Sequence, residues 1–267
     1  MHPNIPRVGL GTFNNTVPNE CVETVRSALE MGYRHIDTAI AYDNEREVGD
    51  GIRQASVDRD DIFLASKVWR DKMAPEAVLS ETKASRERLG VDTIDLMYVH
   101  WPAETYVAEE TLPAFDELVD KGVISHIGVS NFEPDQLTEA QDILDAPIYA
   151  NQVEMHPFCP QHELVERAQQ DNHWLVAYCP LARGAVFDHP VIVDVAKEHD
   201  ITPAQATLAW LLTKENVIPI PKATGNGHLR ENLAATDVSL SSSAVSRIDA
   251  IETRERQVDP AWAPWND

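Results

Sequence analysis

Four side chains capable of acid–base chemistry stand out because each comes at or just after the end of a short apolar segment. They are Asp37, Tyr42, Lys67 and His100. Lysine and aspartate are rarely buried without a partner, and an unpaired polar group at the end of a buried strand is costly. Taken alone, each has an ordinary explanation, such as a turn residue for Asp37 or an ion pair with it for Lys67. Together they predict one polar group at a single edge of a sheet.

These residue types supply the parts needed to reduce a carbonyl, which requires a hydride at carbon and a proton at oxygen. A tyrosine with its ordinary pKa of about 10 donates poorly near neutral pH. A nearby ammonium lowers that pKa by favouring the phenolate, and a carboxylate keeps the ammonium charged and in place. A neutral histidine can orient the carbonyl and donate to its oxygen. We therefore predict that Tyr42 is the proton donor, supported by Lys67, Asp37 and His100.

The elements that must position these residues form a repeating pattern. Short apolar segments rich in Val and Ile alternate with segments of helical periodicity, and this alternation predicts a parallel α/β sheet. Eight strands are predicted, which is the number in a closed (β/α)8 TIM barrel. In such a barrel the active site lies at the C-terminal ends of the strands. The predicted strands are residues 8–13, 33–38, 62–68, 94–100, 124–130, 148–154, 174–180 and 217–223.

Helical spacing of apolar residues is clearest at 19–32, 75–90, 112–122 and 203–215. An open doubly wound sheet is the competing fold, but its usual G-x-G-x-x-G turn lacks the third glycine after the first strand. No Pro/Gly/Ser-rich linker divides the sequence, so residues 1–267 are predicted to form a single domain. Beyond the last βα unit we expect an extra C-terminal helix near 242–252 and then an irregular tail.

The net charge of −22 repels phosphates, which argues against nucleic acid and against an anionic membrane surface. The acidic residues are scattered, as on salt-adapted proteins, so we hypothesise a halophilic source; an ordinary acidic protein is the alternative. No apolar run approaches the ~18 residues of a membrane span. The N-terminus does not resemble a signal peptide, and the three cysteines form no C-x-x-C. These features predict a cytoplasmic protein.

His156, Cys159 and His162 are residue types that bind metals, and they lie three residues apart. Pro157 and Pro160 would break any helix that aligned these side chains, and no fourth ligand is evident. We therefore predict no metal.

The segments around the four residues resemble those of the aldo-keto reductase family, whose catalytic tetrad matches Asp37, Tyr42, Lys67 and His100. The matching sequence motifs include G-x-R-x-I-D-T-A-x-x-Y and H-W-P, and they occur in the same order over almost the whole chain. The resemblance implies reduction of aldehydes or ketones to alcohols with a nicotinamide cofactor. The matching segments are residues 32–42, 66–69, 100–102, 127–132, 151–154, 178–181 and 220–222.

The resemblance also implies which residues hold the cofactor. Ser130, Asn131 and Gln152 would bind the carboxamide of the nicotinamide, and Tyr178 would stack on its ring. Residues of the first strand would lie near the ribose, and those of 222–232 near the phosphates and adenine. The full implied set is Gly11, Thr12, Ser130, Asn131, Gln152, Tyr178, Pro180, Leu181, Lys222, Ala223, Thr224, His228, Glu231 and Asn232.

Two positions in this segment bear on the choice between NADP and NAD. Where the family commonly has a hydroxyl residue and then an arginine for the 2′-phosphate, this chain has Ala223 and His228. Histidine is a weak, pH-dependent cation. Thr224, Arg230 or the backbone of 225–227 could compensate. We expect NADP, with NAD or dual use left open.

The loop 103–109 is short, which resembles bacterial diketogluconate and methylglyoxal reductases and implies an open pocket. Phe13, Trp69 and Trp101 are its predicted apolar walls, and Trp262 or Trp265 could cover it. The resemblance implies a small carbonyl substrate and a monomer. Two other functions stay open: a regulatory barrel that binds cofactor without turnover, and a lyase or isomerase that uses Lys67 as a Schiff-base amine.

Overall fold

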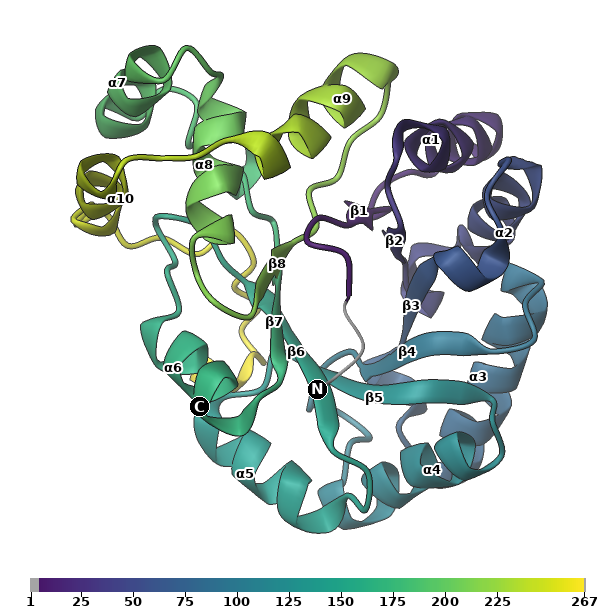
Figure 1. The fold of residues 1–267 in the computed structure, drawn as a ribbon. Helices are drawn as coiled ribbons and strands as arrows, with labels where there is room; N and C mark the ends of the chain where they lie inside the picture. The colour runs from purple at the N-terminus through teal and green to yellow at the C-terminus, as the bar shows by residue number, and fades with distance from the viewer. Residues whose placement is uncertain (1–4, 267) are drawn as a thin grey trace.

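Eight parallel strands pair in chain order, from β1 to β8, in the computed structural model, which describes residues 5–266 (Figure 1). The helices lie outside the ring of strands (Figure 1). This arrangement confirms the predicted (β/α)8 barrel. The strands are β1 (Leu10–Gly11), β2 (His35–Asp37), β3 (Phe63–Val68), β4 (Ile94–Val99), β5 (Ile124–Ser130), β6 (Ile148–Glu154), β7 (Trp174–Tyr178) and β8 (Val217–Pro219).

The ring is closed by backbone hydrogen bonds between β1 and the segment that contains and follows β8. The amide of Gly9 donates to the carbonyl of Pro219 at 3.0 Å, and that of Gly11 donates to Pro221 at 3.3 Å. A Cβ at Gly11 would lie 2.8 Å from the carbonyl oxygen of Ile220. Glycine at position 11 therefore allows the first and last strands to approach.

The strands at this seam are shorter than predicted. The segment 8–13 forms strand only at Leu10–Gly11, and 217–223 only at Val217–Pro219. Pro219 and Pro221 have no backbone N–H to donate to a neighbouring strand, which limits regular pairing there. The predicted strands in the middle of the sheet, such as β5 and β6, have the expected bounds.

The predicted helix ends are largely confirmed. Gly32 and Gly90 adopt left-handed conformations, with φ of 114° and 68°, immediately after α1 and α3. The helix predicted at 112–122 begins earlier, at Ala108, and continues through Pro113. The helices are α1 (Pro18–Met31), α2 (Glu45–Gln54), α3 (Pro75–Leu89), α4 (Ala108–Asp120), α5 (Pro134–Ile143), α6 (His162–Asp171), α7 (Pro190–Glu198), α8 (Pro203–Leu212), α9 (Asn226–Ala234) and α10 (Ser242–Asp249).

The extra C-terminal helix is α10, and an irregular segment follows it (yellow in Figure 1). Apolar side chains fill both the layer between helices and sheet and the barrel interior. The interior cluster is Ile5, Ala65, Leu96, Tyr98, Tyr149, Ala150, Val176, Ile218 and Ile220. Among residues 5–266, no helix combines the length and the apolar character that crossing a membrane requires.

Candidate active site

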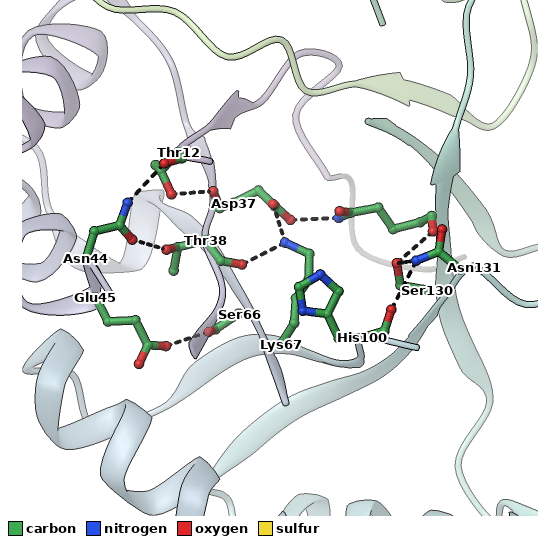
Figure 2. Close-up of polar contacts among 11 residues, drawn as sticks. Thr12, Asp37, Thr38, Asn44, Glu45, Ser66, Lys67, His100, Ser130 and Asn131 are labelled. Carbon is green, nitrogen blue, oxygen red and sulfur yellow. Dashed lines mark hydrogen bonds and ion pairs between the residues drawn. The ribbon is translucent and has the colours of Figure 1, made fainter. Parts of the chain in front are cut away.

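A buried ion pair joins β2 to β3 at the mouth of the barrel (Figure 2). The Nζ of Lys67 lies 2.5 Å from Oδ1 of Asp37 and donates to the carbonyl oxygen of Thr38 at 2.7 Å. The other Asp37 oxygen, Oδ2, accepts from Nε2 of Gln152 at 2.7 Å. Both charged side chains are at most 2% exposed. The structure therefore brings together Asp37, Lys67 and Gln152 from three different strands.

The ammonium of Lys67 is stabilised by its neighbours. Burial disfavours its charge and acts to lower its pKa, but the carboxylate of Asp37 and the oxygen of Tyr42 raise it more. The net effect places the pKa of Lys67 above its ordinary value, so the side chain is charged at neutral pH.

Tyr42 ends a short 3-10 turn, Ile40–Tyr42, that follows β2. The Nζ of Lys67 lies 5.1 Å from the centroid of its ring. The ammonium of Lys67 acts to lower the pKa of Tyr42, as expected, but the expected net lowering of that pKa is wrong. Burial of the phenol raises that pKa, and the charge of Lys67 opposes the rise without cancelling it. Tyr42 therefore keeps its proton near neutral pH, and giving that proton to an acceptor depends on Lys67, whose charge favours the phenolate that forms.

His100 directly follows β4 and is 7% exposed. Burial, and then the charge of Lys67, hold the pKa of His100 well below its usual range, so the ring is neutral. Within residues 5–266, its Nδ1 has no hydrogen-bond partner. The ring meets Tyr42 and Trp69 edge to face, with centroids 6.0 and 4.8 Å apart. The four predicted acid–base residues thus lie together at one end of the barrel.

A second polar group lies beside His100, at the ends of β5, β6 and β7. The side-chain nitrogen of Asn131 donates to Oγ of Ser130 at 3.0 Å and to the carbonyl of His100 at 3.1 Å. Its side-chain oxygen accepts from the hydroxyl of Tyr178 at 2.9 Å. Ser130 donates in turn to the carbonyl of Gln152 at 2.8 Å. The residues expected at the nicotinamide carboxamide are therefore held in one network.

The remaining expected cofactor residues lie at the seam of the barrel and on α9. Gly11 forms a backbone bridge with Lys222, which joins the first and last parts of the sequence. The hydroxyl of Thr12 donates to the carbonyl of Asp37 at 3.0 Å. Pro180 and Leu181 belong to the loop after β7, where Cys179 has a φ of 51°.

Around α9 the side chains differ widely in exposure. Lys222 and His228 are exposed, Thr224 is half-buried, and Ala223 and Asn232 are buried. The carboxylate of Glu231 lies 3.3 Å from Nδ1 of His228. An acidic neighbour offsets what positive charge His228 carries, so this end of the site offers less attraction to a phosphate than an arginine would.

Sequence reasoning missed two buried residues that follow Tyr42. Asn44 accepts from the hydroxyl of Thr38 at 2.8 Å and donates to the carbonyl of Thr12 at 2.9 Å, which links the loops after β1 and β2 (Figure 2). A polar residue at a helix start usually indicates a cap, and Asn44 precedes α2 without making any side-chain cap bond.

Glu45 is the second missed residue, and it is 2% exposed. It accepts 2.6 Å hydrogen bonds from Ser66, the neighbour of Lys67, and from Ser85 of α3. Arg88 donates to its other oxygen at 2.7 Å. Figure 2 shows Glu45 reaching Ser66 from α2. No local pattern distinguishes such an inward glutamate from the exposed acidic residues common at helix starts.

The aromatic side chains expected to line the pocket differ in exposure and in the residues they contact. Phe13, which is 51% exposed, meets Tyr42 edge to face at 5.3 Å, and Trp69 contacts His100. Trp101 is 5% exposed and packs beneath Trp262 and Trp265, at centroid distances of 4.8 and 5.7 Å.

His156, Cys159 and His162 do not form a group that could hold a metal ion. His156 instead lies 2.8 Å from the carboxylate of Glu154. Across residues 5–266 no cluster of three His, Cys, Asp or Glu side chains could hold a metal ion.

Comparisons with known proteins agree with this geometry. The model of the Aldo/keto reductase family matches residues 7–253. An aldo-keto reductase of Mycolicibacterium smegmatis is 39% identical over 254 residues, which are 95% of this chain and 92% of that protein. Methylglyoxal reductase DkgB of Escherichia coli O157:H7 is 34% identical over 259 residues, 96% of each chain. An aldo-keto reductase from a Medee basin deep-sea metagenome library, solved as a crystal structure, superposes with a TM-score of 0.91 at 33% identity, covering 95% of this chain and 94% of that one.

Proposed function

This chain belongs to the aldo/keto reductase family, whose members reduce carbonyls with NAD(P)H, and we propose that Tyr42 is its proton donor. The observation that carries this proposal is the position of Tyr42 beside the charged Lys67 and the neutral His100. A protonated phenol at this point can give its proton to a carbonyl oxygen as the carbon accepts a hydride.

Each of the other residues has a distinct task in the proposed mechanism. Lys67 stabilises the phenolate that remains once Tyr42 has given up its proton, and Asp37 keeps Lys67 charged and in place. His100, being neutral, donates a hydrogen bond that orients the carbonyl oxygen. Because the buried pair is already formed, little rearrangement is needed when charge develops on the oxygen.

The donor and acceptor groups beside His100 suit a primary carboxamide, which offers one carbonyl oxygen and one NH2. We therefore assign Ser130, Asn131 and Gln152 to the nicotinamide carboxamide and Tyr178 to the face of the ring. When bound, the nicotinamide supplies the hydride. Lys222 and the start of α9 would hold the phosphates, with Glu231 and Asn232 near the adenine.

NADP is the cofactor we favour, with NAD as a real competitor. Lys222 is exposed and positioned by the bridge to Gly11, which suits a phosphate. Buried Ala223 offers no hydroxyl, and His228 is paired with Glu231. This weakens the case for a 2′-phosphate and makes measurable activity with NADH an expected result.

Small aldehydes and α-dicarbonyls are the proposed substrates. The support is the similarity to a methylglyoxal reductase, together with the aromatic side chains of Phe13 and Trp69 around Tyr42 and His100. The loop before α4 is also short, and it ends at Val107 rather than at the predicted residue 109. Trp101 completes the wall on the side of the C-terminal segment.

Several broader features are proposed with this function. Residues 1–267 would form one domain that acts as a monomer in the cytoplasm. The net charge of −22 would keep the protein off nucleic acids and anionic membranes, and it suits a salt-adapted source. No observation favours a regulatory barrel without turnover.

The test is the initial rate with methylglyoxal and simple aldehydes, measured with NADPH and NADH in parallel at low and at molar salt. Turnover that is faster with NADPH, and faster in salt, is expected. Full activity and stability without salt would contradict the halophilic origin. Tight cofactor binding with no turnover under any condition would contradict the reductase and favour the regulatory barrel.

A further inference from the structure

The segment after α10 returns to the mouth of the barrel and is fastened there by one buried carboxylate. We propose that Glu154 is a positioning residue that holds this segment, residues 255–266, over the substrate entrance and thereby sets the KM for bulky carbonyl substrates. The inference rests on the proposed reductase function and adds a specificity-determining residue to it.

Glu154 is the last residue of β6 and is fully buried. Its Oε1 accepts from the backbone N–H of Gln257 at 2.5 Å, and its Oε2 accepts from that of Val258 at 2.8 Å. His156 lies 2.8 Å from the same Oε1. An ionised carboxylate only accepts hydrogen bonds, so it suits two adjacent peptide N–H groups, and such charge-assisted bonds are strong.

The side chain of Glu154 contacts mainly the C-terminal segment, which is distant in sequence, rather than its own sheet. Gln257 and Val258 lie 103 and 104 residues further along the chain. A further hydrogen bond, from the backbone N–H of Glu255 to the carbonyl oxygen of Phe158 at 3.0 Å, joins the same segment to the loop after β6. The anchor therefore determines where the segment leaves the sheet.

Beyond the anchor, the segment packs on the loop that follows His100. Ala263 is fully buried, and the rings of Trp262 and Trp265 contact Trp101. Asp259 accepts from the indole N–H of Trp265 at 2.8 Å, which fixes that ring.

The same segment also reaches the loop that follows β3. The guanidinium of Arg70 lies 3.9 Å from the ring centroid of Trp262 and 5.4 Å from that of Trp69. Since Trp69 contacts His100, the two loops that flank His100 are both tied to Trp262. Displacing the segment would therefore change the wall of the pocket without touching the acid–base residues.

The decisive variant is Glu154→Gln, because an amide keeps the shape but offers one acceptor oxygen in place of two. We expect the KM for 4-nitrobenzaldehyde to rise about tenfold, which corresponds to about 1.4 kcal/mol. The KM for methylglyoxal, a much smaller substrate, should change less than about twofold. The kcat and the Kd for NADPH should stay within the same margin. The amides of Gln257 and Val258 should exchange hydrogen faster.

A double-mutant cycle with Trp262→Ala separates positioning from a general loss of stability. If Glu154 acts through the segment, the double variant will show the same KM as the more affected single variant. Glu252→Gln is the matched control, because it makes the same charge change at an exposed site near the start of the segment, and it should leave every constant unchanged.

An unchanged KM, additive effects in the cycle, or a weaker Kd for NADPH would each overturn the proposal. If Glu154→Gln does not fold, Gln257→Pro removes the donor from the other side and must give the same KM pattern. Absence of turnover in the wild-type protein would contradict the proposed reductase function. Turnover in the variants with an unchanged KM would contradict only the role of Glu154.

Discussion

The ammonium of Lys67 and the carboxylate of Asp37 lie 2.5 Å apart in a region that is closed to solvent, with side chains 1% and 2% exposed. Such a pair is expensive to bury, and each partner is tolerated only because the other is present. Each partner is thus needed for stability while the other is present, in addition to its part in the proposed chemistry.

Removing one partner should destabilise the protein strongly. Lys67→Met leaves Asp37 buried without a counter-charge, and the expected loss is about 3–5 kcal/mol in the free energy of unfolding. The double variant with Asp37→Asn should recover part of that loss. Urea denaturation measures both. Lys121→Met breaks an exposed ion pair with Glu117 and should cost less than about 1 kcal/mol. Equal losses in the buried and exposed variants would contradict this account.

Tyr42→Phe should lower kcat for carbonyl reduction by about 10²–10⁴-fold, because the ring remains and only the proton donor is lost. The Kd for the cofactor, measured by fluorescence titration, should stay nearly unchanged. Tyr106→Phe removes a hydroxyl from another partly buried tyrosine and serves as the control. A Tyr42→Phe variant with unmodified turnover would rule out the assignment of the proton donor.

The stability of the protein should fall as the pH falls below about 6.5, the ordinary histidine pKa. Burial, and then the charge of Lys67, lower the pKa of His35 to about 3 and that of His100 well below its usual range. Below pH 6.5 the unfolded chain therefore binds protons that the folded chain does not, and each group lowers the free energy of unfolding by about 1.4 kcal/mol per pH unit.

Urea denaturation at several pH values from about 7 to about 5 measures this slope. His100→Asn should remove the part of the slope that His100 contributes and leave the part that His35 contributes. A slope that does not change in His100→Asn would mean that His100 is not held neutral.

His228→Arg should raise the ratio of kcat/KM with NADPH to that with NADH. An arginine carries a permanent charge and can bind a phosphate through two N–H groups, whereas His228 is a weak cation beside Glu231. Measuring the rates with both cofactors under one condition gives the ratio. If it does not move, His228 lies outside the cofactor site.

Local patterns in the sequence were enough to predict the barrel and the four acid–base residues. Strand and helix periodicity identified eight βα units, and the rule that active sites lie at the C-terminal strand ends brought Asp37, Lys67 and His100 to one edge. The lengths of β1 and β8 were overestimated. Hydrophobic periodicity does not show that Pro219 and Pro221 lack a backbone N–H to donate to a neighbouring strand.

Other properties depend on contacts between residues that are far apart in sequence. The direction of the Tyr42 pKa shift depends on how much water its surroundings exclude, and a residue list contains no such information. Asn44 and Glu45 look like ordinary helix-start residues until the fold turns them inward.

The sequence by itself determined the kind of fold and the residue types available for chemistry, because both follow from short-range periodicity and from the cost of burying polar groups. The tertiary structure alone decided that Asp37 meets Lys67, and that Glu154 meets a segment more than 100 residues away. The first pairing follows from the parallel pairing of β2 with β3, and the second from the packing of the C-terminal segment against the end of β6.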